Sequence, residues 1–269
     1  SSASLTTSNI YLNRDFREGT GQNKREEWGQ GFLLDLKSGY TDGTVGFGLD
    51  AVGMLGMTLD SSAGRHVGSS MIPTDDGKAV DNWARGGATA KARFAKTEAR
   101  YGYLRPNLPI LVSNDGRLLP TMFHGAMLTS EEVRDLKFTL ARLNKYTARD
   151  STDRQDIRVH CKNKRYACDT RADHFDTAGL EYRFNERLSA QYQVAKLVTD
   201  ARKVATLVSI TVGLQRRVLR GEQWSYQLQV VLRADWLLQQ IPLDADFPAR
   251  IRPGIAGAAE LRGVELLAA

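Results

Sequence analysis

The segment WGQGFLLDLKSGY, residues 28–40, alternates between two kinds of side chain. One face carries Phe32, Leu34 and Leu36 in its middle and an aromatic residue at each end, whereas the reverse face carries mostly glycines and charges. A period of two indicates a β-strand whose faces meet different surroundings. Twelve residue steps of roughly 3.3 Å, tilted by about 45°, rise about 28 Å, close to the height of the lipid-facing band between two aromatic girdles.

The same alternation returns along the chain, and it is interrupted by connections of two lengths. Strands are predicted at residues 44–59, 84–95, 97–105, 176–184, 188–194 and 224–236. Short turns are expected at 41–43, 96–97, 133–136, 185–187 and 218–223, and long loops at 15–27, 60–83, 106–120 and 147–173. Short turns at one rim and long loops at the other are typical of outer-membrane barrels.

These patterns predict an all-β protein, namely an antiparallel transmembrane β-barrel or an incomplete part of one, with short periplasmic turns and long outer loops. Roughly eleven strands are expected, an odd number, whereas single-chain bacterial barrels have even counts. A soluble β-sandwich or barrel is the alternative, because its strands alternate too. Such a sheet gains nothing from aromatic residues at both ends of an apolar face, so the membrane barrel is favoured.

Composition excludes several other classes of protein. The chain has 269 residues, a net charge of +6 and 42% apolar residues, too apolar and too mixed in charge for a disordered chain. No apolar run approaches the roughly 18 residues of a spanning helix. Residues 1–9 do not resemble a signal peptide, so we expect the numbering to start after any leader. Neither metal-ligand spacing nor a catalytic motif is found, so no metal, cofactor or enzymatic activity is expected.

Several stretches of the chain carry a resemblance to a known family. They are YLNRDF at 11–16, EWGQGF at 27–32, SGYTDGTVGFGLD at 38–50, TAKAR at 89–93, LVSNDGRLLP at 111–120, and DHFD followed by AG at 173–179. These stretches resemble the OprD-type (Occ) porins, outer-membrane channels of pseudomonads that admit small carboxylate-bearing nutrients. The similarity runs from about residue 11 to residue 196, continues as a hairpin pattern to residue 236, and ends there.

The resemblance implies a porin in the outer membrane of a Gram-negative bacterium. It also implies passive, substrate-selective uptake of small carboxylate-containing solutes such as amino acids, by a monomer or a homotrimer. The family's barrel has about eighteen strands, more than this chain holds. We therefore expect residues 1–236 to form the barrel portion, corresponding to the N-terminal part of such a porin, and residues 237–269 to form a tail unlike the family.

A channel needs a narrowing, and the long loop 106–120 is the best candidate for it. Its prolines stiffen it, and the Asn-Asp-Gly sequence at 114–116 is a tight-turn signal, so we expect it to fold into the lumen. The resemblance identifies it as the family's constriction loop and matches Arg117 to an arginine that lines the eyelet. A guanidinium offers a carboxylate a bidentate, permanently charged partner. Ser113 and Asp115 are the neighbouring candidates; alternatively, Arg117 simply pairs with Asp115.

Three basic residues of one predicted strand, Arg85, Lys91 and Arg93, share its lumen face. They are candidate pore-lining residues that would extend a basic track towards the narrowing. The alternative is a solvated face on which such cations pair with carboxylates of neighbouring strands, and this is the commoner fate of any single one. Asp35, Asp50, Glu98 and Glu181 are the expected cross-strand partners.

The long loop 147–173 and its flanks are rich in Lys and Arg. Contact with lipopolysaccharide and other outer-membrane lipid explains this charge more simply than nucleic acid, for which stacking aromatic residues are sparse. Cys161 and Cys168 lie in the same loop. The sequence leaves two states open for them: a disulfide formed in an oxidising compartment, or two free thiols.

The sequence therefore leaves three hypotheses of function. The first is the carboxylate-selective channel, and the second is a non-conducting porin fragment whose open sheet edge would leave backbone groups unpaired in lipid. The third is a soluble β-rich binding protein. Solubility without detergent distinguishes the third hypothesis from the other two, because a lipid-facing surface aggregates in water.

Overall fold

The structure, a computed structural model, describes residues 1–17, 24–66, 69–158, 171–185, 188–199, 204–217, 223–233 and 264–268. Its main feature is one antiparallel sheet of 13 strands. The strands are β1 (Ser2–Asp15), β2 (Lys24–Lys37), β3 (Val45–Ser61), β6 (Asn82–Phe94), β7 (Thr97–Leu104), β10 (Met122–Ser130), β11 (Leu136–Thr147), β12 (Gln155–Asp156), β13 (Ala172–Arg183), β14 (Leu188–Thr199), β15 (Val204–Arg217), β16 (Gln223–Arg233) and β17 (Val264–Ala268).

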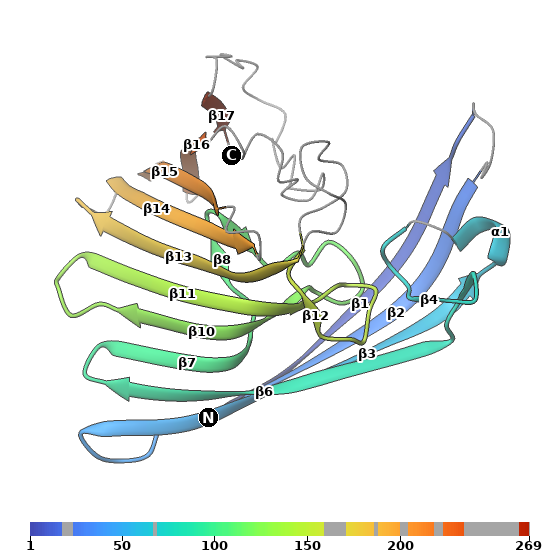
Figure 1. Ribbon diagram of the computed structural model, residues 1–269, viewed down its shortest axis with the longest axis horizontal. Helices are drawn as coiled ribbons and strands as arrows, with labels where there is room; N and C mark the ends of the chain where they lie inside the picture. The colour runs from blue at the N-terminus through green and yellow to red at the C-terminus, as the bar shows by residue number, and fades with distance from the viewer. Residues whose placement is uncertain are drawn as a thin grey trace.

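The strands follow one another in the sheet almost in chain order, from β1 at one edge to β17 at the other, and only the short β12 pairs off this path with β11. Figure 1 shows the sheet as a single curved wall. The connections at one rim are short, and those at the other are long. Two of the long loops carry small elements of their own: α1 (Ala63–His66), β4 (Thr74–Asp75) and β5 (Lys78–Ala79) in one, and β8 (Asn107–Leu108) and β9 (Leu111–Val112) in the other.

The convex, outward face of the sheet is apolar and exposed. Trp28 is 43% exposed on β2, and Leu49 is 59% exposed on β3. Leu34 and Leu36 share this face with Trp28, because residues two apart on a strand lie on the same side of a sheet. Large apolar side chains turned towards the surroundings are expected where those surroundings are lipid.

The core lies against the opposite, inward face of the sheet, where two long loops fold onto it. Met54 on β3 and Trp83 on β6 pack in one cluster with Met71, Ile72, Leu118 and Leu119 of the loops and Met122 at the start of β10. The inward face therefore lines a space that the chain's own loops partly fill, whereas the outward face has no such cover among the described residues.

The predicted all-β architecture is confirmed, and so is the alternation of short and long connections. Without β12 and β17, which have 2 and 5 residues, the main sheet contains eleven strands, the number expected. Of the expected tail 237–269, only residues 264–268 are described, and they pair with β16. Cys161 and Cys168 lie outside the described residues. Among the described residues, no helix is long and apolar enough to cross a membrane.

The outward face offers a direct test of its contact with lipid. We expect Leu49→Arg to lower the free energy of unfolding by about 2–4 kcal/mol, the cost of an arginine near the middle of a bilayer. Val133→Arg, in the exposed short turn between β10 and β11, is the control and should change it little. Urea unfolding of the chain in lipid vesicles measures both, and equal, small effects would mean that Leu49 faces water.

Candidate functional site

The loop between β7 and β10, which we call the inward loop (residues 105–121), crosses the concave side of the sheet (Figure 1). Its β8–β9 hairpin is closed at the base by a hydrogen bond from Ser113 N to the carbonyl of Pro106 at 2.9 Å. At its tip, Ile110 is buried, and its backbone N–H donates to Oε1 of Gln193 on β14 at 3.3 Å. The loop that leaves the wall at β7 is therefore anchored several strands away.

The other limb of the inward loop lies against β2. Gly29 and Gly31 point inward there, and Leu118 fills the space above them. A Cβ at position 31 would approach the carbonyl oxygen of Leu118 to 2.6 Å, so a larger residue would displace the loop. Because one limb touches β2 and the tip touches β14, the inward loop spans the space enclosed by the wall.

The candidate residues of the inward loop lie in its second half. Arg117 donates through Nε to the carbonyl of Ser69 at 3.3 Å and through Nη1 to that of Gly116 at 2.8 Å, so it lies where the two inward-folded loops meet. Asp115 is exposed, in a turn that Asn114 closes by accepting from Gly116 N at 3.0 Å. The Ser113 hydroxyl is buried and has no hydrogen-bond partner among the described residues.

Arg85 on β6 acts as a clamp on the loops. Its guanidinium donates to the carbonyl of Pro120, at the end of the inward loop, and to those of Ala148 and Ser151, which follow β11. Three accepting carbonyls satisfy most of its donors, which is the usual requirement for a partly buried guanidinium. The structure thus brings Arg85 to the inward loop at Pro120, which lies three residues beyond Arg117 in the chain.

Lys91 and Arg93 lie further down the same face of β6, towards the short turns. The Lys91 ammonium donates to Asp50 Oδ1 at 2.5 Å and to the carbonyl of Ser38 at 2.8 Å, and only 7% of the residue is exposed. The Tyr40 ring lies beneath both cations, 4.9 Å from Lys91 Nζ and 4.4 Å from Arg93 Cζ. Lys91 is therefore paired with Asp50, as the alternative interpretation of this strand anticipated, and Arg93 is the more exposed of the two.

Tyr40, in the short turn between β2 and β3, extends this cluster to β7. Its hydroxyl donates to Glu98, which also accepts from Arg100. Burial, together with the hydrogen bond to the Glu98 carboxylate, raises the pKa of Tyr40 to about 12, so the phenol stays neutral at physiological pH. The pore-lining roles predicted for Arg117, Asp115, Ser113, Arg85, Lys91 and Arg93 stay predictions; the geometry divides them into one group at the inward loop and another near the short turns.

Two anchors of the inward loop were not found from the sequence. Arg105 Nη2 lies 2.6 and 2.5 Å from the two carboxylate oxygens of Asp35 on β2, which ties the start of the loop to the facing wall. Gln193 holds the tip and donates to Thr177 Oγ1 at 2.8 Å. In both anchors the interacting residues are far apart in sequence, so residue spacing does not indicate the contact. The only local indication was the pair of glycines at 29 and 31, since glycines within a strand often mark the close approach of another segment.

Among the described residues, no group of three or more His, Cys, Asp and Glu side chains is placed to hold a metal ion. Of the inward-face charges described above, Lys91 and Arg100 are paired with carboxylates and Arg85 donates to backbone carbonyls, whereas Arg93 is exposed. What the arrangement can do is narrow a passage and present guanidinium groups to a passing anion, which is the chemistry of selective permeation.

Comparison with known proteins agrees with this geometry. Residues 1–206 match the family described as outer membrane porin, OprD family. The chain belongs to the OprD family. Members of this family are outer-membrane channels rather than enzymes. The porin-like protein GalP of Pseudomonas putida is 39% identical over 185 residues, covering 68% of this chain and 44% of GalP, so the chain spans less than half the length of this OprD-family relative.

Solved structures of OprD-family porins share the fold. The crystal structure of OccK9 (OpdG) of Pseudomonas aeruginosa is 38% identical, with a TM-score of 0.75 over 85% of this chain and 57% of that one. OpdK of the same organism, crystallised with vanillate, is 35% identical with a TM-score of 0.71 over 86% of this chain and 56% of that one. The incomplete wall seen here therefore corresponds to part of a longer OprD-type barrel.

The contact between Gly31 and Leu118 can be tested with a matched pair of glycines. Gly31→Ala forces the inward loop away from β2 and should lower the free energy of unfolding by about 1–3 kcal/mol. Gly53→Ala on β3 is the control, because a Cβ there meets nothing within 4 Å. Protease cleavage within the inward loop should become faster only in the first variant. Equal cleavage in both variants would show that the loop does not depend on this contact.

The clamp formed by Arg85 predicts a different effect. Arg85→Leu leaves three carbonyl groups without their donor, so we expect a loss of about 1–3 kcal/mol in the free energy of unfolding and faster hydrogen exchange in the inward loop. Arg93→Leu removes the same charge from an exposed position on the same strand and should leave exchange in that loop unchanged. Equal exchange in both variants would contradict the clamp.

Proposed function

We propose that the chain forms part of the wall and the narrowing of a passive, substrate-selective channel for small carboxylates such as amino acids or aromatic acids. The observation that carries this proposal is the inward loop, anchored on β2 by Leu118 and on β14 through Gln193. A loop held at both sides of the enclosed space leaves a passage of limited width. Solute passes down its concentration gradient, with no cofactor and no energy source.

Several features support an anionic substrate. Arg117 is carried on the loop that narrows the passage, and Arg85 reaches the same loop from β6. In a narrow, poorly hydrated passage the attraction between a guanidinium and a carboxylate exceeds that of the same pair in bulk water. OpdK, which shares 35% identity with the chain, was crystallised with vanillate, an aromatic carboxylate. We extend the preference for carboxylates to this chain on these grounds.

The pairing of charges along the wall supports passage rather than tight binding. Lys91 is paired with Asp50 and Arg100 with Glu98, whereas Arg93 is exposed and is therefore the best placed of these wall cations for contact with solute. A few accessible cations attract an anion without holding it, and a selective channel requires such weak contacts if solute is to leave again.

A second function is favoured by one observation, the open edges of the sheet. Among the described residues, β1 pairs only with β2, and no strand closes the wall between β1 and β17. An open edge in lipid leaves backbone groups unpaired at several kcal/mol each. If no further strands complete the wall, the chain is a non-conducting porin fragment. Single-channel conductance in a planar bilayer distinguishes the two, because a fragment gives no steady conductance steps.

Arg117 provides the test of selectivity. In a conducting form, Arg117→Ala should lower anion selectivity and reduce the apparent affinity for benzoate, used as the test carboxylate, by about tenfold, the worth of one charge-assisted hydrogen bond. Reversal potentials in a salt gradient and the block of chloride current by benzoate measure the two effects.

The matched control is Arg134→Ala, which removes an almost fully exposed guanidinium from the short turn between β10 and β11. It should leave both quantities unchanged. Unchanged reversal potentials in the Arg117 variant would remove this residue from the selectivity site, while steady conductance would still support a channel.

A further inference from the structure

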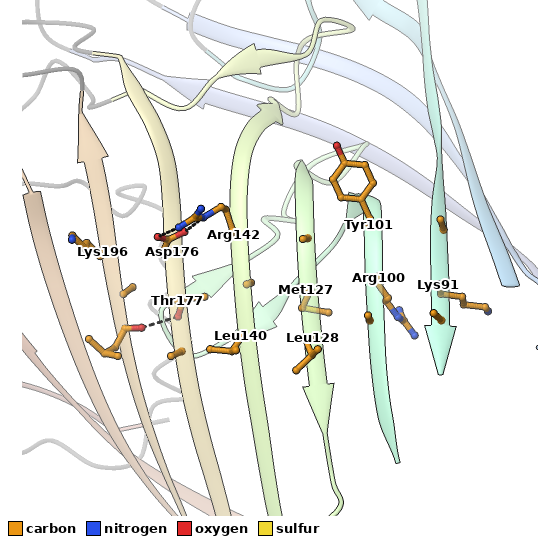
Figure 2. Close-up of a pocket in the computed structure, with 18 of the residues that line it drawn as sticks. Lys91, Arg100, Tyr101, Met127, Leu128, Leu140, Arg142, Asp176, Thr177 and Lys196 are labelled. Carbon is orange, nitrogen blue, oxygen red and sulfur yellow. Dashed lines mark hydrogen bonds and ion pairs between the residues drawn. The ribbon is translucent and has the colours of Figure 1, made fainter. Parts of the chain in front are cut away.

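A shallow apolar groove of about 940 Å³ runs across the outward face of the sheet, over β6, β7, β10, β11, β13 and β14 (Figure 2). Its floor is a row of directly paired residues, one from each strand: Ala92, Ala99, Leu128, Leu140, Ala178 and Val194. Five steps between neighbouring strands of about 4.8 Å make this row about 24 Å long. The groove lies on the opposite side of the wall from the inward loop and is no part of the proposed passage.

The next row of outward residues bounds the groove with charge. Arg142 on β11 donates to both carboxylate oxygens of Asp176 on β13, at 2.6 and 2.8 Å, although 66% of its side chain is exposed. Lys196 on β14 is the strand partner of Asp176 and is exposed. His174 Nε2 lies 3.4 Å from the same carboxylate. Figure 2 shows Arg142, Asp176 and Lys196 side by side on adjacent strands.

This cluster carries more positive than negative charge. Asp176 is its single carboxylate and is hydrogen-bonded by Arg142, and Lys196, its strand partner, acts on the same carboxylate at longer range. Two permanent cations therefore share one carboxylate. An excess of positive charge on a lipid-facing surface is unfavourable, so long basic side chains there reach for the interface or for an anionic group. Among the described residues, the cluster therefore keeps one positive charge in excess, which an anionic group could balance.

The position of the cluster along the strands indicates which anion. Asp176 and Lys196 lie nearer the long-loop ends of β13 and β14 than the short-turn ends, where Tyr182 and Phe184 are exposed. Arg142 lies beside Asp176, near the middle of β11. The apolar groove lies between these aromatic residues and the charges. A lipid whose phosphate group lies at the level of the cluster could therefore pack its acyl chain against the adjacent apolar row that forms the floor of the groove.

We propose that this outward groove binds a phosphate-bearing membrane lipid, with its phosphate at Arg142 and Lys196 and one acyl chain along the row from Val194 towards Ala92. Arg142 supplies directed hydrogen-bond donors, and Lys196 gives the cluster its excess of positive charge, a combination that suits a phosphate. A second copy of this chain is the other occupant to consider, but the two groove rows described above offer it no acidic group except Asp176, which Arg142 already engages.

Native mass spectrometry of the 269-residue chain refolded in detergent tests the proposal with two probes of equal acyl length, phosphatidylglycerol and phosphatidylcholine. The unaltered chain should retain phosphatidylglycerol in preference to phosphatidylcholine. Lys196→Gln leaves the Arg142–Asp176 pair intact and should weaken the retention of phosphatidylglycerol by about fivefold, and the Arg142→Gln/Lys196→Gln double variant should weaken it by about fivefold more. Ala178→Phe, which fills the groove, should weaken the binding of both lipids.

The control is Lys137→Gln, which removes an exposed lysine from the short-turn end of the same strand as Arg142 and should change nothing. Three results would overturn the proposal: equal retention of both lipids by the unaltered chain, retention unaffected by loss of Lys196, or a stable oligomer that excludes lipid and dissociates in the Ala178→Phe variant. The last result would assign the groove to a second copy of the chain instead.

Discussion

The constraint on which the structure depends is that backbone N–H and C=O groups must be paired wherever the chain meets lipid. A single antiparallel meander satisfies this requirement strand by strand, from β1 through β16. Because neighbouring side chains of a strand point to opposite faces, the same arrangement gives the strands a largely apolar outward face and an inward face that carries most of the charges. The core of the molecule therefore forms where loops fold onto the inward face, around Trp83, Leu118 and Leu119, and not between two layers of sheet.

The inward face shows how polar groups are accommodated in such a wall. Burying an ammonium group costs several kcal/mol unless an opposite charge and further hydrogen bonds accompany it. Lys91 has both, from Asp50 and from the carbonyl of Ser38. Arg85 instead uses loop carbonyls, so the position of the loops and the position of this guanidinium depend on each other. The charges that shape the passage are thus partly structural, and only those with spare donors can act on a solute.

Much of the wall could be predicted from residues 28–40 and from similar segments, because each strand shows the alternation of apolar and polar side chains within its own sequence. β1 is not among the strands predicted, because most of its first half is Ser, Thr and Ala and the alternation there is weak. The site was less accessible to prediction. The partners of Arg105 and Ile110 lie 70 and 83 residues away along the chain. Contacts between residues so far apart in sequence form only because the whole sheet is curved.

The two ends of the sheet differ in how far their apolar outward face extends. On β3 it runs from Val45 to Leu59, interrupted only by small residues, whereas on β13 it gives way to Asp176 after Leu180 and Ala178. A lysine or arginine costs about 2–4 kcal/mol at the bilayer midplane and close to nothing at its surface. If the row of Arg142, Asp176 and Lys196 lay at the midplane, this part of the wall would be strongly destabilised. The boundary of the hydrocarbon layer must therefore cross strands β11, β13 and β14 close to that row. On these strands the boundary lies nearer the short turns than it does on β3. A boundary at this level brings the phosphate groups of lipids within reach of the cations.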